Sequence, residues 1–155
     1  MEIPITIGRA TLSDLEEIVA IEESCLSSEE IVSYEFLEES IRKIADTFLV
    51  ARDENQLLGY VLGESQSLHP TWIEIRSLAI HPDHRGQGLG TLLLASLKQV
   101  AVEGGYEYLH LTCPDDLLSY FEMNDFVEEE VPEASCARFS GWNLIWANPF
   151  YQEEV

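Results

Sequence analysis

A glycine-rich block between a strand-like segment and a helix-like segment is the feature that most constrains the fold. Residues 85–90 read R-G-Q-G-L-G, after the apolar, β-rich run Thr71–Ile80 and before the predicted helix Thr91–Glu103. The first turn of a helix has unpaired N–H groups and a positive dipole end, so it binds phosphate. Glycines at 86, 88 and 90 let the main chain approach a pyrophosphate and adopt torsions that other residues avoid. The block predicts a strand, loop and helix that hold a phosphate-bearing ligand.

Two other phosphate-binding motifs compete with this interpretation. The P-loop, G-x-x-x-x-G-K-[ST], needs a lysine after its last glycine, and none follows Gly90. The dinucleotide fingerprint needs G-x-G-x-x-G in a βαβ unit that opens the chain, with an acidic residue about 20 positions later. Neither pattern fits this sequence.

The charge distribution also indicates an anion site. The chain has 29 acidic and 8 basic residues and a net charge of −21, so nucleic acid and anionic membrane surfaces are excluded as partners by repulsion. A cationic partner is favoured, although acidity that only maintains solubility is the alternative. Between Ile75 and Val102 the only acidic residue is Asp83, and five basic or imidazole side chains fall there: Arg76, His81, His84, Arg85 and Lys98.

Length and composition are those of one globular domain. The 155 residues are 46% hydrophobic and 24% charged, which predicts a single domain over residues 1–155. The N-terminal residues lack the pattern of a signal peptide and no apolar run approaches about 18 residues, so we expect a cytoplasmic protein. The three cysteines, Cys25, Cys113 and Cys136, have no metal or redox spacing, and the four histidines are scattered, so we expect buried free thiols and no metal.

Periodicity predicts alternating strands and helices. Ile3, Ile5 and Ile7 predict a first strand that ends near Arg9. Thr11 or Ser13 caps a helix to about Glu23, with Glu16 in capping-box position and a solvated face that includes Glu22. The loop Cys25–Glu30 is either a substrate lid or a plain connector. The remaining predicted elements are a helix Ser33–Lys43, a hairpin of Thr47–Arg52 and Leu57–Ser65, a strand Tyr108–Thr112, a helix Pro114–Asn124, and strands Phe126–Val131 and Ala137–Trp146.

Two ordered motifs resemble the GNAT superfamily of N-acetyltransferases. Residues 77–94, S-L-A-I-H-P-D-H-R-G-Q-G-L-G-T-L-L-L, are similar to its signature, with Arg85, Gly88 and Gly90 as the core, and residues 115–126 resemble its second element. Short matches at 113–117, 21–25 and 59–63 are similar to the arylalkylamine N-acetyltransferase branch. The resemblance implies an α/β (α+β) domain with a mixed, mostly antiparallel sheet of six to seven strands. About four helices flank that sheet, which is splayed between strands 4 and 5.

The resemblance also implies a binding site for acetyl-CoA as cosubstrate, without a metal. The strand residues Leu78, Ala79 and Ile80 would pair with the pantetheine arm, although an ordinary core strand is compatible with the same residues. Arg85 would contact phosphate, and Phe121 would form an apolar wall. The pyrophosphate would be held by the amides of Gly86, Gln87, Gly88, Leu89, Gly90 and Thr91.

The acceptor amine must lose a proton, since an amine with a pKa of about 10.4 is neutral in only about one molecule in 2,500 at pH 7. Our candidate base is Glu74, which by strand alternation would share a face with Arg76 and Leu78. The arylalkylamine branch usually has histidines at the positions of Glu74 and Arg76, whereas other GNAT members use glutamate. The alternative for Glu74 is a surface carboxylate paired to Arg76 or to a neighbouring strand.

The leaving thiolate has no obvious proton donor in this sequence. Many GNAT members use a tyrosine that aligns with Phe121, which cannot donate a proton. Tyr120 is adjacent, but neighbouring helical residues point about 100° apart, so it replaces that tyrosine only if the local register differs. A strand amide near Leu78–Ile80 would stabilise the oxyanion without the acid.

The sequence therefore predicts an acetyl-CoA-dependent N-acetyltransferase that acts on a small, cationic primary amine, similar to an arylalkylamine or a polyamine. A protein or peptide amine as acceptor and a non-catalytic acyl-CoA-binding module are the alternatives. Trp72, Trp142 and Trp146 either line an aromatic acceptor pocket or pack in the core. Monomer and homodimer both remain open.

Overall fold

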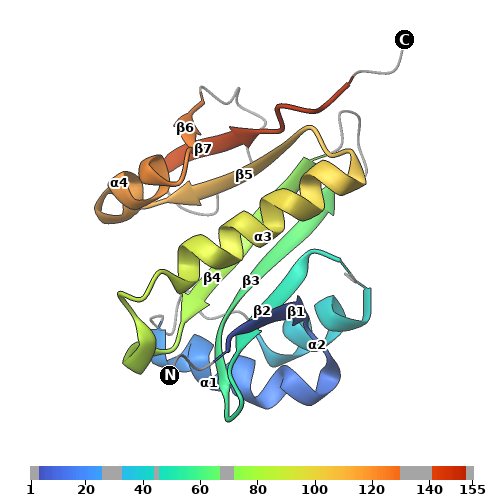
Figure 1. The fold of residues 1–155 in the computed structure, drawn as a ribbon, viewed down its shortest axis with the longest axis vertical. Coiled ribbons are helices and arrows are strands. Elements are labelled where there is room, and N and C mark those ends of the chain that lie inside the picture. Colours follow the sequence, from blue (N-terminus) through green and yellow to red (C-terminus); the bar gives the residue numbers. More distant parts are fainter. Residues whose placement is uncertain (1–3, 26–32, 44–45, 67–71, 130–140, 153–155) are drawn as a thin grey trace.

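The computed structural model describes residues 4–25, 33–43, 46–66, 72–129 and 141–152. In these ranges seven strands form one sheet in the order β1-β2-β3-β4-β5-β7-β6 (Figure 1). Every neighbouring pair is antiparallel except β4 and β5, which are parallel. The strands are β1 Thr6–Arg9, β2 Phe48–Arg52, β3 Leu57–Gln66, β4 Trp72–Ile80, β5 Tyr108–Cys113, β6 Val127–Glu128 and β7 Trp142–Ala147.

Four α-helices cover the two faces of this sheet, and each face has its own apolar core. On one face α1 (Leu15–Cys25) and α2 (Tyr34–Lys43) pack against side chains such as Phe48 and Tyr60. On the other face α3 (Leu89–Gly104) and α4 (Asp115–Met123) pack against the second core, which includes Val61 and Ile73. Figure 1 shows α3 running along β3 and β4. The predicted mixed sheet with about four helices is confirmed.

The sheet opens between β4 and β5, as the resemblance implies. The two strands pair only from Trp72↔Tyr108 to Glu74↔His110. Beyond Glu74, β4 continues to Ile80 and β5 continues to Cys113 without further pairing to each other. Six residues of β4, roughly 20 Å at about 3.3 Å per residue, therefore present a backbone edge that β5 does not cover.

A β-bulge interrupts β4 at Arg76. Leu62 of β3 pairs with Ser77 whereas Gly63 pairs with Ile75, so the register skips Arg76. As a result Ile73, Ile75 and Leu78 all contact the α3 core, although Leu78 lies three positions after Ile75, an odd spacing that regular alternation would place on opposite faces. The prediction that Glu74 shares a face with Leu78 is wrong, because the extra residue inverts the alternation between them.

Two predictions about α1 are also wrong. The backbone N–H of Thr11 donates to Asp14 Oδ2 at 2.9 Å, and Thr11 caps a short 3₁₀ turn, Leu12–Asp14, so Asp14 rather than Glu16 completes the capping box. Glu22, predicted on the solvated face, is fully buried. It accepts hydrogen bonds from the Tyr60 hydroxyl and from Ser77 Oγ, the latter at 2.6 Å, because α1 packs this residue directly onto β3 and β4.

Most other boundaries agree with the sequence within two residues. α3 starts at Leu89, two residues before the predicted start, and ends where Gly105 adopts a left-handed φ of 73°. Residues 26–30 of the predicted lid or connector lie outside the described residues, as do Ile3, His69, Cys136 and the adjoining ends of the last two predicted strands. Among the helices that the structure describes, none has the length and apolar character needed to cross a membrane.

Candidate functional site

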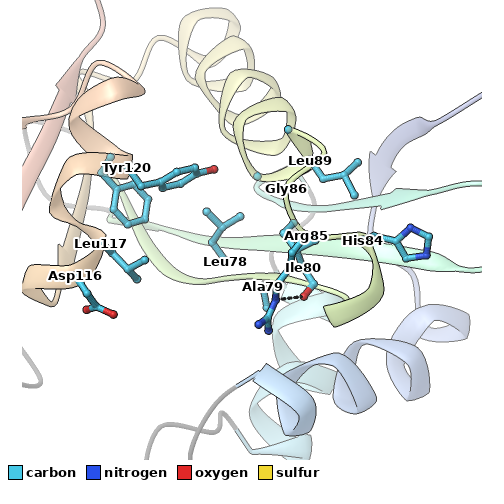
Figure 2. Close-up of a pocket in the computed structure, with 13 residues that line it drawn as sticks. Leu78, Ala79, Ile80, His84, Arg85, Gly86, Leu89, Asp116, Leu117 and Tyr120 are labelled. Carbon is cyan, nitrogen blue, oxygen red and sulfur yellow. Dashed lines mark hydrogen bonds between the residues drawn. The ribbon is translucent and has the colours of Figure 1, made fainter.

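A cleft of about 550 Å³ lies between the open part of β4, the start of α3 and one side of α4 (Figure 2). Most of its lining is apolar side chain or glycine backbone. Nine of the eleven predicted ligand-binding residues line it, and Gln87 and Thr91 do not. The lining residues are Leu78, Ala79, Ile80, His84, Arg85, Gly86, Gly88, Leu89, Gly90, Asp116, Leu117, Tyr120 and Phe121.

The glycine turn forms one end of this cleft. Gly86 and Gly88 have φ values of 79° and 81°, a left-handed conformation that other residues rarely adopt, and a Cβ at either position would meet no atom within 4 Å. Gly88 is the N-cap of α3, so no side chain at that position accepts hydrogen bonds from the first turn. The open space and the amides of this turn fit the diphosphate of coenzyme A.

Arg85 brings a positive charge to the same end. Its side chain is exposed, and Nε donates to the carbonyl oxygen of Ile80 at 3.4 Å, the dashed line in Figure 2. This hydrogen bond places the guanidinium where β4 meets the glycine turn. Both the cationic group and the turn therefore face the same cleft.

Two adjacent aromatic residues of α4 form the opposite wall. Phe121 is buried, with its ring centroid 5.9 Å from that of Phe126. Tyr120 also lines the cleft, and Figure 2 shows its hydroxyl pointing across toward the start of α3. That hydroxyl lies against Gly90, where a Cβ would collide with it. Tyr120 is the only residue with a side-chain hydroxyl among those that line this cleft.

Glu74 does not line the cleft, because it lies on the opposite face of the sheet. Its Oε1 is 2.7 Å from Nδ1 of His110 on β5, and the two side chains are only 17% and 8% exposed. Arg76 instead pairs with Glu64 of β3, with Nη2 3.1 Å from Oε1. Of the predicted partners for Glu74, the neighbouring strand is therefore correct and Arg76 is not.

His110, which contacts the candidate base Glu74, was not among the residues predicted from the sequence. Its Nε2 is 3.2 Å from Oδ1 of Asn143 on β7, and Thr112 Oγ1 donates to the same oxygen at 3.1 Å. The ring of Trp72 meets the imidazole edge-on at 5.6 Å. The only sequence signal for this residue is a polar side chain between Leu109 and Leu111 of the strand.

The tryptophans and the thiol have different surroundings. Trp142 and Trp146 pack against the α3 core, whereas Trp72 lies near Tyr108, with ring centroids 5.2 Å apart.

Cys113 is buried, as predicted, and burial raises the pKa of its thiol, with Asp116, Asp115 and Glu122 raising it further. Among the described residues no group of three or more histidine, cysteine, aspartate or glutamate side chains is arranged to hold a metal ion.

Comparisons with solved structures show the same fold. The loading GNATL domain of CurA from Lyngbya majuscula is 15% identical, with 94% of this chain and 98% of that chain aligned and a TM-score of 0.79. The ribosomal-protein-S18-alanine N-acetyltransferase from Escherichia coli is 17% identical over 97% of each chain, with a TM-score of 0.72. A GNAT family N-acetyltransferase from Escherichia coli in complex with CoA is 20% identical, with 96% of this chain and 83% of that chain aligned and a TM-score of 0.74.

A family assignment follows from the sequence itself. The profile of the acetyltransferase (GNAT) family matches residues 14–120, more than two thirds of the chain. The matched region includes the unpaired edge of β4, the glycine turn, α3 and most of α4, and acetyl-CoA is the cosubstrate expected of this family. The chain belongs to the acetyltransferase (GNAT) family.

Proposed function

We propose that this protein transfers the acetyl group of acetyl-CoA directly to the primary amine of a small molecule similar to an arylalkylamine or a polyamine. The observation that carries the proposal is the edge of β4 that β5 leaves uncovered. Leu78, Ala79 and Ile80 on this edge line the cleft, and the carboxylate of Glu74 lies four residues before them on the other face.

The cleft residues have distinct roles in binding acetyl-CoA. The backbone of Leu78–Ile80 pairs with the pantetheine arm, as one strand pairs with another. The amides between Gly86 and Thr91 bind the pyrophosphate, with Arg85 supplying positive charge. Phe121 packs against the thioester end as an apolar wall.

Glu74 is the proposed base. The ammonium group of the acceptor first loses one proton, which Glu74 accepts directly or through water. The neutral nitrogen then bonds to the thioester carbonyl carbon, the carbon–sulfur bond breaks, and the second proton of the nitrogen passes to solvent. An amide near Leu78–Ile80 stabilises the oxyanion, and the thiolate leaves without a side-chain acid because Phe121 has no hydroxyl.

The net charge of the protein favours a cationic amine as the acceptor. A net charge of −21 attracts cationic amines. A protein or peptide amine is the second enzyme candidate, since a similar structure is named as an acetyltransferase of a ribosomal protein. A non-catalytic acyl-CoA-binding module is the third candidate, motivated by the absent hydroxyl at Phe121.

An assay of free thiol release from acetyl-CoA, with a panel of arylalkylamines, polyamines and peptides, separates these candidates. We expect turnover with small amines and at least a tenfold lower rate for Glu74→Gln between pH 6 and 9, because the amide cannot accept the proton. Glu23→Gln, an exposed glutamate of α1, is the matched control. Calorimetric CoA binding without thiol release from any amine would establish the binding module instead, and an unchanged Glu74→Gln rate would refute the base.

Restoring the aligned hydroxyl tests the leaving-group argument. Because Phe121 lies where many GNAT members have a tyrosine acid, we predict that Phe121→Tyr raises kcat about tenfold or more, with little change in the KM for acetyl-CoA. Phe121→Leu is the control, since it keeps an apolar wall and adds no proton donor. Equal kcat values for Phe121→Tyr and the wild type would show that thiolate departure needs no acid here.

A further inference from the structure

We propose that His110 is a positioning residue for the base, and that it forms with Glu74 a carboxylate–imidazole dyad that accepts the proton as one unit. This inference rests on the proposed function, since it concerns the same reaction. It uses a histidine from β5, not from the β4 positions at which the arylalkylamine branch has its histidines.

The dyad stands where the sheet begins to open. Glu74↔His110 is the last residue pair of the parallel register between β4 and β5. The residues that follow on the two strands do not pair. A ligand that lies between the two strands would therefore have its inner end beside this pair. The dyad is therefore the nearest titratable pair at the closed end of the opening.

Both ring nitrogens of His110 face an oxygen atom of a neighbouring side chain. The carbonyl oxygen of Asn143 can only accept, and it accepts from Thr112 Oγ1 while facing His110 Nε2 at 3.2 Å. The other ring nitrogen, Nδ1, faces the Glu74 carboxylate at 2.7 Å. A neutral imidazole has one N–H and satisfies one of these two acceptor oxygens, whereas two N–H groups satisfy both. The proposed acid form of the dyad is the form with both N–H groups.

The base form has one proton fewer. In it the His110 ring carries its single proton on Nε2, which donates to Asn143 Oδ1, and Nδ1 faces Glu74 Oε1 without a proton. The ammonium group of the acceptor first gives one proton to Glu74, which shares it with Nδ1, and the dyad is then in its acid form. The neutral nitrogen bonds to the thioester carbon, the carbon–sulfur bond breaks, the thiolate leaves, and the second proton of the nitrogen passes to solvent.

Among the described residues, most groups that contact the dyad are uncharged. Trp72 presents an uncharged ring edge to the imidazole, and Asn143 and Thr112 are neutral. Tyr108 lies beside Trp72, and burial followed by the charges of Glu129, Glu107 and Glu74 raises its pKa, so its hydroxyl stays neutral through the working range. Glu64 of β3 is the cross-strand neighbour of Glu74, and its carboxylate is paired with Arg76 at 3.1 Å, so this ion pair is a further charged neighbour of the dyad.

The first test is the pH profile of kcat in His110→Gln. Glutamine does not titrate near neutrality, so the base becomes a lone carboxylate, a group that titrates well below an imidazole. We expect kcat at pH 7 to fall at least tenfold, the acidic limb to move more than one pH unit lower, and the KM for acetyl-CoA to change less than twofold. An acidic limb in its wild-type position would overturn the dyad. His81→Gln, which removes an imidazole outside the cleft and the dyad, is the control.

The second test needs no turnover. We expect the ¹⁵N shift of His110 Nδ1 to differ between the wild type and Glu74→Gln at the same pH, because Nδ1 loses its carboxylate partner. Identical spectra in the two proteins would overturn the proposal even if His110→Gln failed to fold. Wild-type protein that binds CoA but acetylates no amine would contradict the proposed function, and the spectra would still judge the dyad.

Discussion

At the scale of single residues, the third glycine of the turn has a packing reason that differs from that of the first two. Gly86 and Gly88 need left-handed torsions, whereas a Cβ at Gly90 would collide with the Tyr120 hydroxyl. The nearest remaining atom of that side chain is Cζ, at 3.4 Å from the same Cβ position. Gly90 and Tyr120 therefore depend on each other.

This dependence predicts a non-additive pair of substitutions. Gly90→Ala should weaken CoA binding about tenfold, because the methyl group pushes the Tyr120 hydroxyl into the cleft. In a Tyr120→Phe background the same change should cost less than about twofold, since the colliding oxygen is absent. Calorimetric titration of CoA into the four proteins measures this cycle. Additive losses would mean that the two residues do not restrict each other.

Cys113 illustrates how burial controls reactivity at a single residue. Its raised pKa keeps the thiol protonated. In a variant with serine at positions 25 and 136, we therefore predict that Cys113 reacts slowly with a thiol reagent at pH 8 in the folded protein and fast after denaturation. A thiol whose folded-state pKa is raised stabilises the fold fully below its unfolded pKa of about 8.5, and that contribution falls as pH rises. The denaturation midpoint should therefore fall less steeply above pH 8.5 in Cys113→Ala. Equal modification rates in folded and unfolded protein would contradict the burial.

At the scale of the elements, the end of α4 contains a residue in an unfavourable conformation. Asp125 follows the helix with a φ of 72°, and its carboxylate, 84% exposed, contributes little through Lys98 Nζ at 3.9 Å. We predict that Asp125→Gly stabilises the fold by about 0.5–1 kcal/mol, a rise of roughly 1–4 °C in Tm. Asp125→Ala keeps the Cβ and should lower Tm. A lower Tm for the glycine variant would show that the lost contact outweighs the backbone strain.

The elements also show which features can be predicted from sequence. The glycine turn, α3 and the hairpin of β2 and β3 follow from local composition and periodicity, and the sequence predicts them within two residues. The bulge at Arg76 does not, because it depends on how β3 and β4 align, and it reverses the face of Leu78 relative to Glu74.

Side-chain partners from distant elements escape sequence analysis for the same reason. Glu22 looks like a surface residue of an amphipathic helix until Tyr60 and Ser77 are placed against it. His110 acquires meaning only when β5 pairs beside Glu74 and β7 brings Asn143 within hydrogen-bonding distance. Each of these two residues lies more than 30 positions along the chain from the hydrogen-bond partners named here.

At the scale of the whole molecule, the net charge of −21 should act on the two substrates in opposite directions. Salt screens the attraction of a cationic amine, so we predict that the KM for the amine rises between about 20 and 300 mM salt, more steeply for a diamine than for a monoamine of similar shape. The KM for anionic acetyl-CoA should stay level or fall. Equal salt dependence for monoamine and diamine would mean that the field of the protein does not guide the acceptor.

The end of the pairing between β4 and β5 also bears on how the two substrates would approach. The cleft beside α3 and the carboxylate of Glu74 lie on opposite faces of the sheet, and the pairing of the two strands stops at Glu74↔His110. With Glu74 as the proposed base, we expect the amine to approach from the face opposite that cleft, so that the carrier and the acceptor would not compete for one surface.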